Sequence, residues 1–339
     1  MSELLLVVAP VLLAFFLAGV LSPFEALGWW AGWYGEDEAE PGEAAEPVHA
    51  DRFVIFLSGI NNASGEAFAE REVAFLKRLK SDLAETATVL VDDIFPYSVT
   101  ERALTGRRTF AWFWRWAVRM RLSGPKLAGF LINIRNLWQV AVSADSRYGP
   151  MYNQGSAAML RSGLRRHGYR EGSGVPVTLI GYSGGGQVAL GAAPHLNRSV
   201  RADVSIISLG GVMSADPGLL TLRHLYHLFG NRDNVQRLGS IFFPGRWPFV
   251  PSPWNTAKKR GIVELVSMGP ADHTGPDGYL DAEKFLPDGR SYLDATIDKI
   301  LELLRREGQD DPDPAQGSPA ADGSRYPKPS SSNHLPASR

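Results

Sequence analysis

The sequence contains no cysteine. This absence excludes disulfide bonds, thiolate metal sites and a cysteine nucleophile, but it fits a reducing and an oxidising compartment equally. The chain also lacks an excess of basic charge, since 35 Lys and Arg residues are balanced by 36 Asp and Glu residues. Phosphate binding needs such an excess, so we do not expect nucleic acid as a partner. Internal repeats, clusters of metal ligands and phosphate-binding loops are missing too, and we therefore expect no cofactor and no metal.

Basic residues are also missing around one long apolar run near the start of the chain. Residues 4–21 are 18 residues without a charged or polar side chain. As a helix they are about 27 Å long, close to the hydrocarbon thickness of a bilayer. We expect a single-pass transmembrane anchor; a signal peptide without its basic region and a buried core helix are the alternatives. No Lys or Arg occurs before Arg52, so the positive-inside rule leaves the side of the membrane undetermined.

The predicted anchor is followed by two segments of different composition. Four aromatic residues stand where an interfacial belt is expected: Trp29, Trp30, Trp33 and Tyr34. We therefore assign residues 1–34 to the anchor and its aromatic interface segment. Residues 35–51 are acidic and rich in Pro, Gly and Ala, which predicts a solvated linker. At the other end, residues 307–339 are rich in Pro, Ser, Ala and Asp and are predicted to be a disordered tail.

Residues 52–306 carry the pattern of one folded α/β domain. Short apolar runs predict strands at 53–57, 88–91, 175–180, 204–209, 225–229 and 262–266. Helical spacing occurs at 65–84, 151–167, 187–193 and 292–306. This order predicts a mainly parallel sheet with helices on both faces, and 339 residues are enough for one large core.

A long insertion, about residues 100–148, separates the second predicted strand from the helix before the third, and we interpret it as a helical cap. Within it, residues 107–121 place arginines on one helical face and large apolar side chains on another. The two sets are Arg108, Arg115 and Arg119, and Trp112, Trp116 and Met120. Two interpretations remain open: a helix lying in the membrane interface, or a cap packed on its own domain with its arginines in solvent.

The most informative stretch is residues 175–187, VPVTLIGYSGGGQ, in which a buried strand runs through a glycine turn into a helix. The turn has the pattern G-x-S-x-G. Its glycines allow a strained bend that exposes the hydroxyl of Ser183 above the end of the strand. The amide of Gly184, at the positive end of the helix dipole, could donate to an oxyanion. The alternative is a glycine turn with a solvated serine.

This strand, turn and helix resemble the nucleophile elbow of the α/β-hydrolase superfamily. The resemblance covers about three quarters of the chain and implies an α/β-hydrolase fold with a catalytic serine, acid and histidine in that order. On this basis Ser183 is the nucleophile and Asp233, in the turn after residues 225–229, is the acid. Asp216, one strand earlier, is the alternative acid.

The same chain order selects the histidine. His273 follows the last predicted strand, whereas the other histidines before the tail precede Asp233: His49, His167, His195, His224 and His227. His334 lies in the predicted tail. The resemblance also implies a second oxyanion donor in the loop after the first strand, the amide of Ile60 or Asn61; a simple turn with an asparagine cap explains that loop equally well.

Together these features predict a membrane-anchored serine hydrolase that acts on a carboxylic ester, with a small-molecule or lipid-like acyl substrate. An acyltransferase that uses the same three residues is one alternative, and a non-catalytic membrane-tethered binding protein on a hydrolase fold is another. The oligomeric state is left open.

Overall fold

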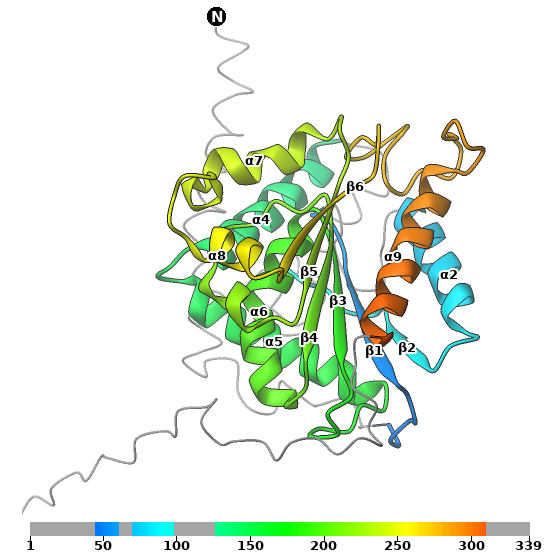
Figure 1. Ribbon diagram of the computed structural model, residues 1–339, viewed down its shortest axis with the longest axis vertical. Coiled ribbons are helices and arrows are strands. Elements are labelled where there is room, and N and C mark those ends of the chain that lie inside the picture. Colours follow the sequence, from blue (N-terminus) through cyan, green and yellow to red (C-terminus); the bar gives the residue numbers. More distant parts are fainter. Residues whose placement is uncertain (1–44, 61–69, 98–125, 310–339) are drawn as a thin grey trace, which may run out of the picture. The chain divides into compact units, whose positions relative to one another are not determined.

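The computed structural model describes residues 45–60, 70–97 and 126–309, and the side chains of residues 126–132 are not included (Figure 1). The chain divides into two units, Met1–Asp298 and Lys299–Arg339, at a point inside the last described helix. In the second unit the described residues form the end of that helix, where Lys299 and Glu302 make an ion pair with a 2.5 Å N–O distance.

In the described part of the chain, six strands form one sheet in which every neighbouring pair is parallel. Its order is β2-β1-β3-β4-β5-β6. The strands are β1 (Arg52–Leu57), β2 (Thr88–Val91), β3 (Val177–Tyr182), β4 (Val204–Leu209), β5 (Leu225–Phe229) and β6 (Val263–Ser267). The predicted α/β class with a parallel sheet is thus confirmed, and the bounds of β2, β4 and β5 are those expected from their apolar runs.

Helices connect the strands. They are α2 (Glu70–Leu83), α4 (Lys126–Ala144), α5 (Gly149–Arg166), α6 (Gly184–Val200), α7 (Asn234–Phe242), α8 (Pro253–Lys259) and α9 (Tyr292–Gln309), with short 3₁₀ turns η2 (Pro217–Thr221) and η3 (Pro244–Arg246). The sequence pattern predicted α2, α5, α6 and α9 but neither α7 nor α8. Both of these helices are short, and their caps, Asp233 and Ser252, are the local signals that mark them.

Alternate side chains of β1 show how helices come to cover both faces of the sheet. Phe53, Ile55 and Leu57 belong to the apolar core that includes residues of α5 and α6. Phe56, which points to the other face, contacts Phe75 of α2 with a ring separation of 5.4 Å. Each such side chain stabilises the fold by about 1.5–3 kcal/mol when it is fully buried. Figure 1 shows α5 and α6 on one side of the strands and α2 on the other.

The first turns of α9 are tied to the same unit. Asp294 accepts a 2.7 Å hydrogen bond from Arg78 of α2, and Thr296 donates to the carbonyl of Tyr279 at 2.8 Å. These contacts connect α9 to α2 and to the loop that follows β6.

No helix within the described ranges combines the length and the apolar character needed to cross a bilayer. The predicted span at residues 4–21, the linker up to residue 44, most of the predicted cap and the tail from residue 310 lie outside those ranges.

Candidate active site

Ser183 occupies a single-residue turn between β3, which ends at Tyr182, and α6, which begins at Gly184. Its backbone has φ 54° and ψ −121°. A positive φ in a residue other than glycine is uncommon and costs about 1–3 kcal/mol, which the surrounding structure has to offset. The bend directs the Ser183 hydroxyl to His273, with 2.8 Å between Oγ and Nε2.

The glycines around Ser183 are required by close packing of the backbone. A Cβ atom at Gly181 would lie 2.6 Å from Cα of Gly186, and one at Gly185 would overlap the carbonyl oxygen of Leu57 at the end of β1. Non-bonded atoms do not approach so closely, so a larger residue would push α6 away from the sheet. The start of α6 therefore packs directly on the carboxyl ends of β1 and β3.

His273 belongs to the irregular loop after β6, and its ring is held from several directions. Its Nδ1 atom lies 2.9 Å from Oδ2 of Asp233, and Nε2 faces Ser183. The ring stacks on Tyr182 with a centroid separation of 5.7 Å, and the Tyr182 hydroxyl donates to the His273 carbonyl at 2.8 Å. Only 11% of the His273 side chain is exposed. Tyr182, the residue before the serine, thus fixes both the ring and the backbone of His273.

Asp233 is fully buried and receives four hydrogen bonds. As the cap of α7 it accepts from the amides of Val235 and Gln236 through Oδ1, at 2.8 and 3.0 Å. Its other oxygen, Oδ2, accepts from Tyr279 at 2.7 Å and faces His273. A carboxylate with this many donors is rigidly placed.

Two opposing effects set the protonation of this carboxyl group. Burial by itself raises the pKa of Asp233, but the hydrogen bond and positive charge offered by His273, with the donors Gln236 and Tyr279, outweigh it. The net pKa of Asp233 lies below its ordinary value. Asp233 is therefore a carboxylate at neutral pH and favours a proton on Nδ1 of His273.

Gly210, directly after β4, makes room for the pair. Its φ is +56°, and a Cβ there would lie 2.6 Å from Oδ2 of Asp233 and 3.1 Å from Nδ1 of His273. A side chain would separate the two groups. Sequence reasoning did not single out Gly210, and the available signal was a glycine directly after the strand predicted at 204–209.

Asp216 stands apart from this arrangement. Its carboxylate caps η2 by accepting a 2.6 Å hydrogen bond from the amide of Gly218. Burial raises the pKa of Asp216 above its ordinary value. The structure thus brings together Ser183, His273 and Asp233, and it gives Asp216 a capping role in another turn.

Gly184 and Ile60 lie next to each other beside Ser183. A Cβ on Gly184 would be 2.8 Å from Cγ2 of Ile60. Gly184 is the first residue of α6, so its amide has no carbonyl one turn earlier in the helix to which it could donate a hydrogen bond. In the loop after β1, Gly59 donates its amide to Glu72 at 3.1 Å, and the Ile60 carbonyl accepts from Asn136 of α4 at 2.7 Å. Asn61, the alternative donor, lies outside the described residues.

A small pocket of about 210 Å³ opens behind Tyr182, between the start of α2 and the loop after His273. Its wall includes Arg71 and Thr274 but not Ser183. Arg71 donates to the carbonyl of Gly275 and lies 3.9 Å from Asp281, so it supports the loop that carries His273. We regard this pocket as part of that support and not as a substrate site.

Comparison with models of protein families found no match to the chain, and comparison with curated proteins found none either. What can be stated is an α/β fold with a parallel sheet, which is compatible with the α/β-hydrolase superfamily. Within residues 45–60, 70–97 and 126–309, His, Asp and Glu residues form no group of three that could hold a metal ion.

Proposed function

We propose that this chain is a serine hydrolase of the α/β-hydrolase superfamily that cleaves carboxylic esters. One observation carries the proposal. Ser183, His273 and Asp233 form an unbroken hydrogen-bonded series, with contacts of 2.8 and 2.9 Å, that ends on a buried carboxylate. A nucleophile, a base and an acid that orients the base are the groups that acyl transfer through a serine requires.

In the proposed reaction, Oγ of Ser183 attacks the ester carbonyl while Nε2 of His273 takes the hydroxyl proton. Asp233 stabilises the resulting imidazolium and keeps its own negative charge. The oxyanion is held by the amide of Gly184, with the Ile60 amide as the second proposed donor. The alcohol leaves with the proton from His273, and an acyl-serine remains. Water, deprotonated by the same histidine, then cleaves the acyl-serine, releases the carboxylic acid and restores Ser183.

An apolar acyl group is the substrate class that we propose. Cγ2 atoms of Val140 and Ile60 lie beside the proposed oxyanion donor, within 2.7 and 2.8 Å of the place of a Cβ on Gly184. Aliphatic side chains next to the proposed oxyanion donor favour an apolar ligand. The apolar run at residues 4–21, which we propose as a single-pass membrane anchor, would bring the site to a lipid-rich environment.

A fluorophosphonate probe tests the proposal without knowledge of the substrate, because it reacts with activated serines. The wild-type chain should be labelled, and Ser183→Ala should lose the label while its thermal unfolding stays unchanged. Ser240→Ala, at an exposed serine, is the matched control and should be labelled like the wild type. Full labelling of Ser183→Ala would move the nucleophile elsewhere. A wild-type chain that is never labelled would favour a non-catalytic binding protein.

A further inference from the structure

The segment Asn234–Arg260, which contains α7, η3 and α8, exposes an unusual amount of apolar surface. Five large apolar side chains within it are more than a third exposed: Val235 (37%), Ile241 (63%), Phe242 (65%), Trp247 (40%) and Phe249 (78%). Exposed apolar residues that are scattered singly need no explanation, but a contiguous group indicates a binding surface. We call Asn234–Arg260 the aromatic surface.

Internal contacts hold the aromatic side chains together. The Trp247 and Phe249 rings are 5.6 Å apart, and Nε1 of Trp247 donates to the carbonyl of Ser240 at 2.7 Å. Ser240 immediately precedes Ile241 and Phe242 at the end of α7, so the loop folds back onto that end of the helix. The loop is fixed by Asn255, which donates to the carbonyls of Trp247 and Val250, at 2.6 and 2.9 Å. The surface is therefore preorganised, which lowers the entropic cost of binding.

The charge of the same segment has one sign. It contains no Asp or Glu and five cations: Arg237, Arg246, Lys258, Lys259 and Arg260. None of the five forms an ion pair with a described residue. The hydrogen bonds of Arg237 go to Oδ1 of Asn234 and the carbonyl of Asn231, which are neutral. The Arg246 guanidinium lies over Trp254, 4.0 Å from the ring centre. In a chain with a net charge of −1, this segment is positive, and ion pairs with the described residues do not compensate it.

We propose that the aromatic surface docks on an anionic lipid bilayer, with Ile241, Phe242, Trp247 and Phe249 in the interface. Tryptophan and phenylalanine bind at the boundary between headgroups and acyl chains, and cations near the surface are attracted to an anionic membrane. A second copy of this surface would bring the same positive charge, which opposes self-association. An anionic bilayer offers an apolar phase for the exposed aromatic and aliphatic side chains and negative charge for the cations.

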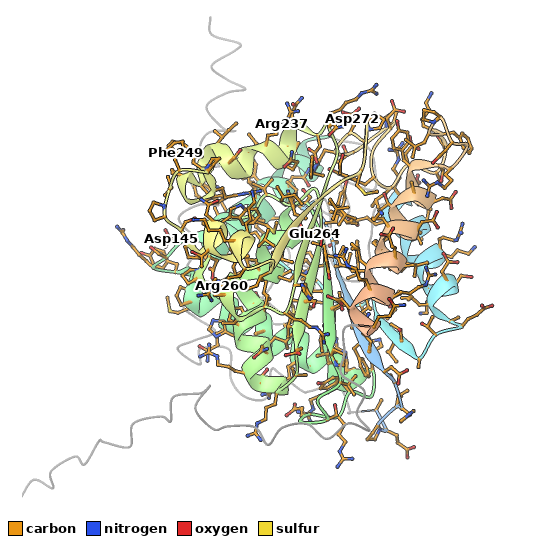
Figure 2. The ribbon with its side chains drawn as sticks, in the orientation of Figure 1. Asp145, Arg237, Phe249, Arg260, Glu264 and Asp272 are labelled. Atoms are coloured by element: carbon orange, nitrogen blue, oxygen red, sulfur yellow. The ribbon has the colours of Figure 1, made fainter. Side chains whose placement is uncertain are left out.

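The aromatic surface lies next to the candidate active site in the chain. Helix α7 begins directly after Asp233, so the surface starts at the carboxylate that faces His273. Phe249 and Arg237 are drawn beside α7, and Arg260 is drawn near α8 (Figure 2). The docking itself depends only on surface chemistry and is independent of the proposed hydrolase activity.

The absence of cysteine allows a local test in the full-length chain. A single thiol introduced by Phe249→Cys is labelled with an environment-sensitive fluorophore, and the protein is reconstituted with phosphatidylcholine vesicles that contain or lack phosphatidylglycerol. Phe285→Cys, at another apolar residue with 65% exposure, is the matched control. A local label reports docking whether or not residues 4–21 anchor the chain.

With phosphatidylglycerol we expect the label at position 249 to shift to the blue and to be quenched by lipids with a doxyl group. The label at position 285 should show neither the blue shift nor the quenching. At about 1 M salt, where the Debye length is about 3 Å, the shift should be largely lost. The additional change Arg237→Gln should weaken it at low salt. Equal water exposure of both labels in anionic vesicles would overturn the proposal. A label at position 249 that is already shielded from water without lipid would also overturn the proposal, because another part of the chain would then cover the surface. Shielding that rises with protein concentration would overturn it too, because a second copy would then cover the surface.

Discussion

The hydroxyl of Tyr279 donates a 2.7 Å hydrogen bond to Oδ2 of Asp233, the same oxygen that faces His273. It also accepts a 2.7 Å hydrogen bond from the amide of Gly230, at the end of β5. Burial, followed by the negative charge of Asp233, raises the pKa of Tyr279, which therefore keeps its proton and remains a donor. Tyr279 thus fixes the carboxylate relative to the sheet, and we assign it a positioning role.

Tyr279→Phe should slow fluorophosphonate labelling and ester turnover about 10- to 100-fold, mainly through kcat, because a hydrogen bond to a charged group contributes about 1.5–3 kcal/mol. The substrate does not contact Tyr279 in the proposed reaction, so KM should change little. Tyr292→Phe, at another buried tyrosine, is the control. An unchanged labelling rate in a folded Tyr279→Phe protein would show that the hydroxyl only supports the fold.

Asp233→Asn should lower turnover by about 10⁴, because an amide carries no negative charge to stabilise the imidazolium, and an amide N–H that donates to Nδ1 favours the wrong tautomer of His273. Asp216→Asn should have a much smaller effect, since its carboxylate caps η2. Steady-state kinetics of the two variants, with circular dichroism to verify folding, make the comparison. The opposite order of effects would assign the acid to Asp216.

Gly185→Ala should destabilise the protein by about 3 kcal/mol, the upper part of the range for overpacking, because its methyl group would overlap the Leu57 carbonyl. Gly172→Ala is the matched control. Gly172 has a φ of +74° but nothing within 4 Å of an added Cβ, so only the left-handed backbone is penalised, by about 1–2 kcal/mol. Urea unfolding measures both. Equal losses would mean that α6 can move away from β1 at little cost.

His227 should make stability depend on pH. It is buried between β4 and α7, 3.3 Å from Oγ of Ser208 and 3.4 Å from Oε1 of Gln236. Burial, and then the charge of Arg246, lower its pKa from 6.5 to about 3, against the opposing influence of Gln236 and Asp233. Between pH 6.5 and about 3, His227 therefore binds a proton in the unfolded chain but not in the folded chain.

The resulting stability is fully present above pH 6.5 and is lost as the pH falls from 6.5 towards 3, by at most about 1.4 kcal/mol per unit. His227→Gln should remove this part of the slope, which urea unfolding at several pH values between these limits would measure. A variant whose stability follows pH as the wild type does would contradict the assignment.

Full-length protein should partition with membranes through residues 4–21, and removal of residues 1–34 should weaken that association. If the aromatic surface also binds lipid, the shortened chain should still be retained on anionic vesicles at low salt and released as salt rises. Fractionation of both forms without detergent is the measurement. Intact full-length protein in the soluble fraction would contradict the anchor.

Much of the fold follows from short-range patterns in the sequence. The runs at 88–91, 204–209 and 225–229 predicted their strands correctly because strands of a parallel sheet are largely buried on both faces, which leaves short, mainly apolar stretches. Ser183 could be located because the elbow needs its glycines within a few residues, a constraint visible in local sequence. Helix α7 was missed because its large apolar side chains face outward, so the usual burial pattern is absent. Helix α8 was missed because it has only seven residues, of which Trp254 and Ala257 are buried.

The sequence by itself determined the class of fold, the strained serine turn and the chain order of Ser183, Asp233 and His273. Only the tertiary structure decided that Asp233, and not Asp216, lies against His273. The reason is distance along the chain: 40 residues separate Asp233 from His273, and 90 separate Ser183 from it, in loops without periodicity. Tyr279 and Gly210 became recognisable for the same reason. Their importance lies in contacts with residues far away in sequence, and packing of β4, β5 and the loop after β6 at one edge of the sheet creates those contacts.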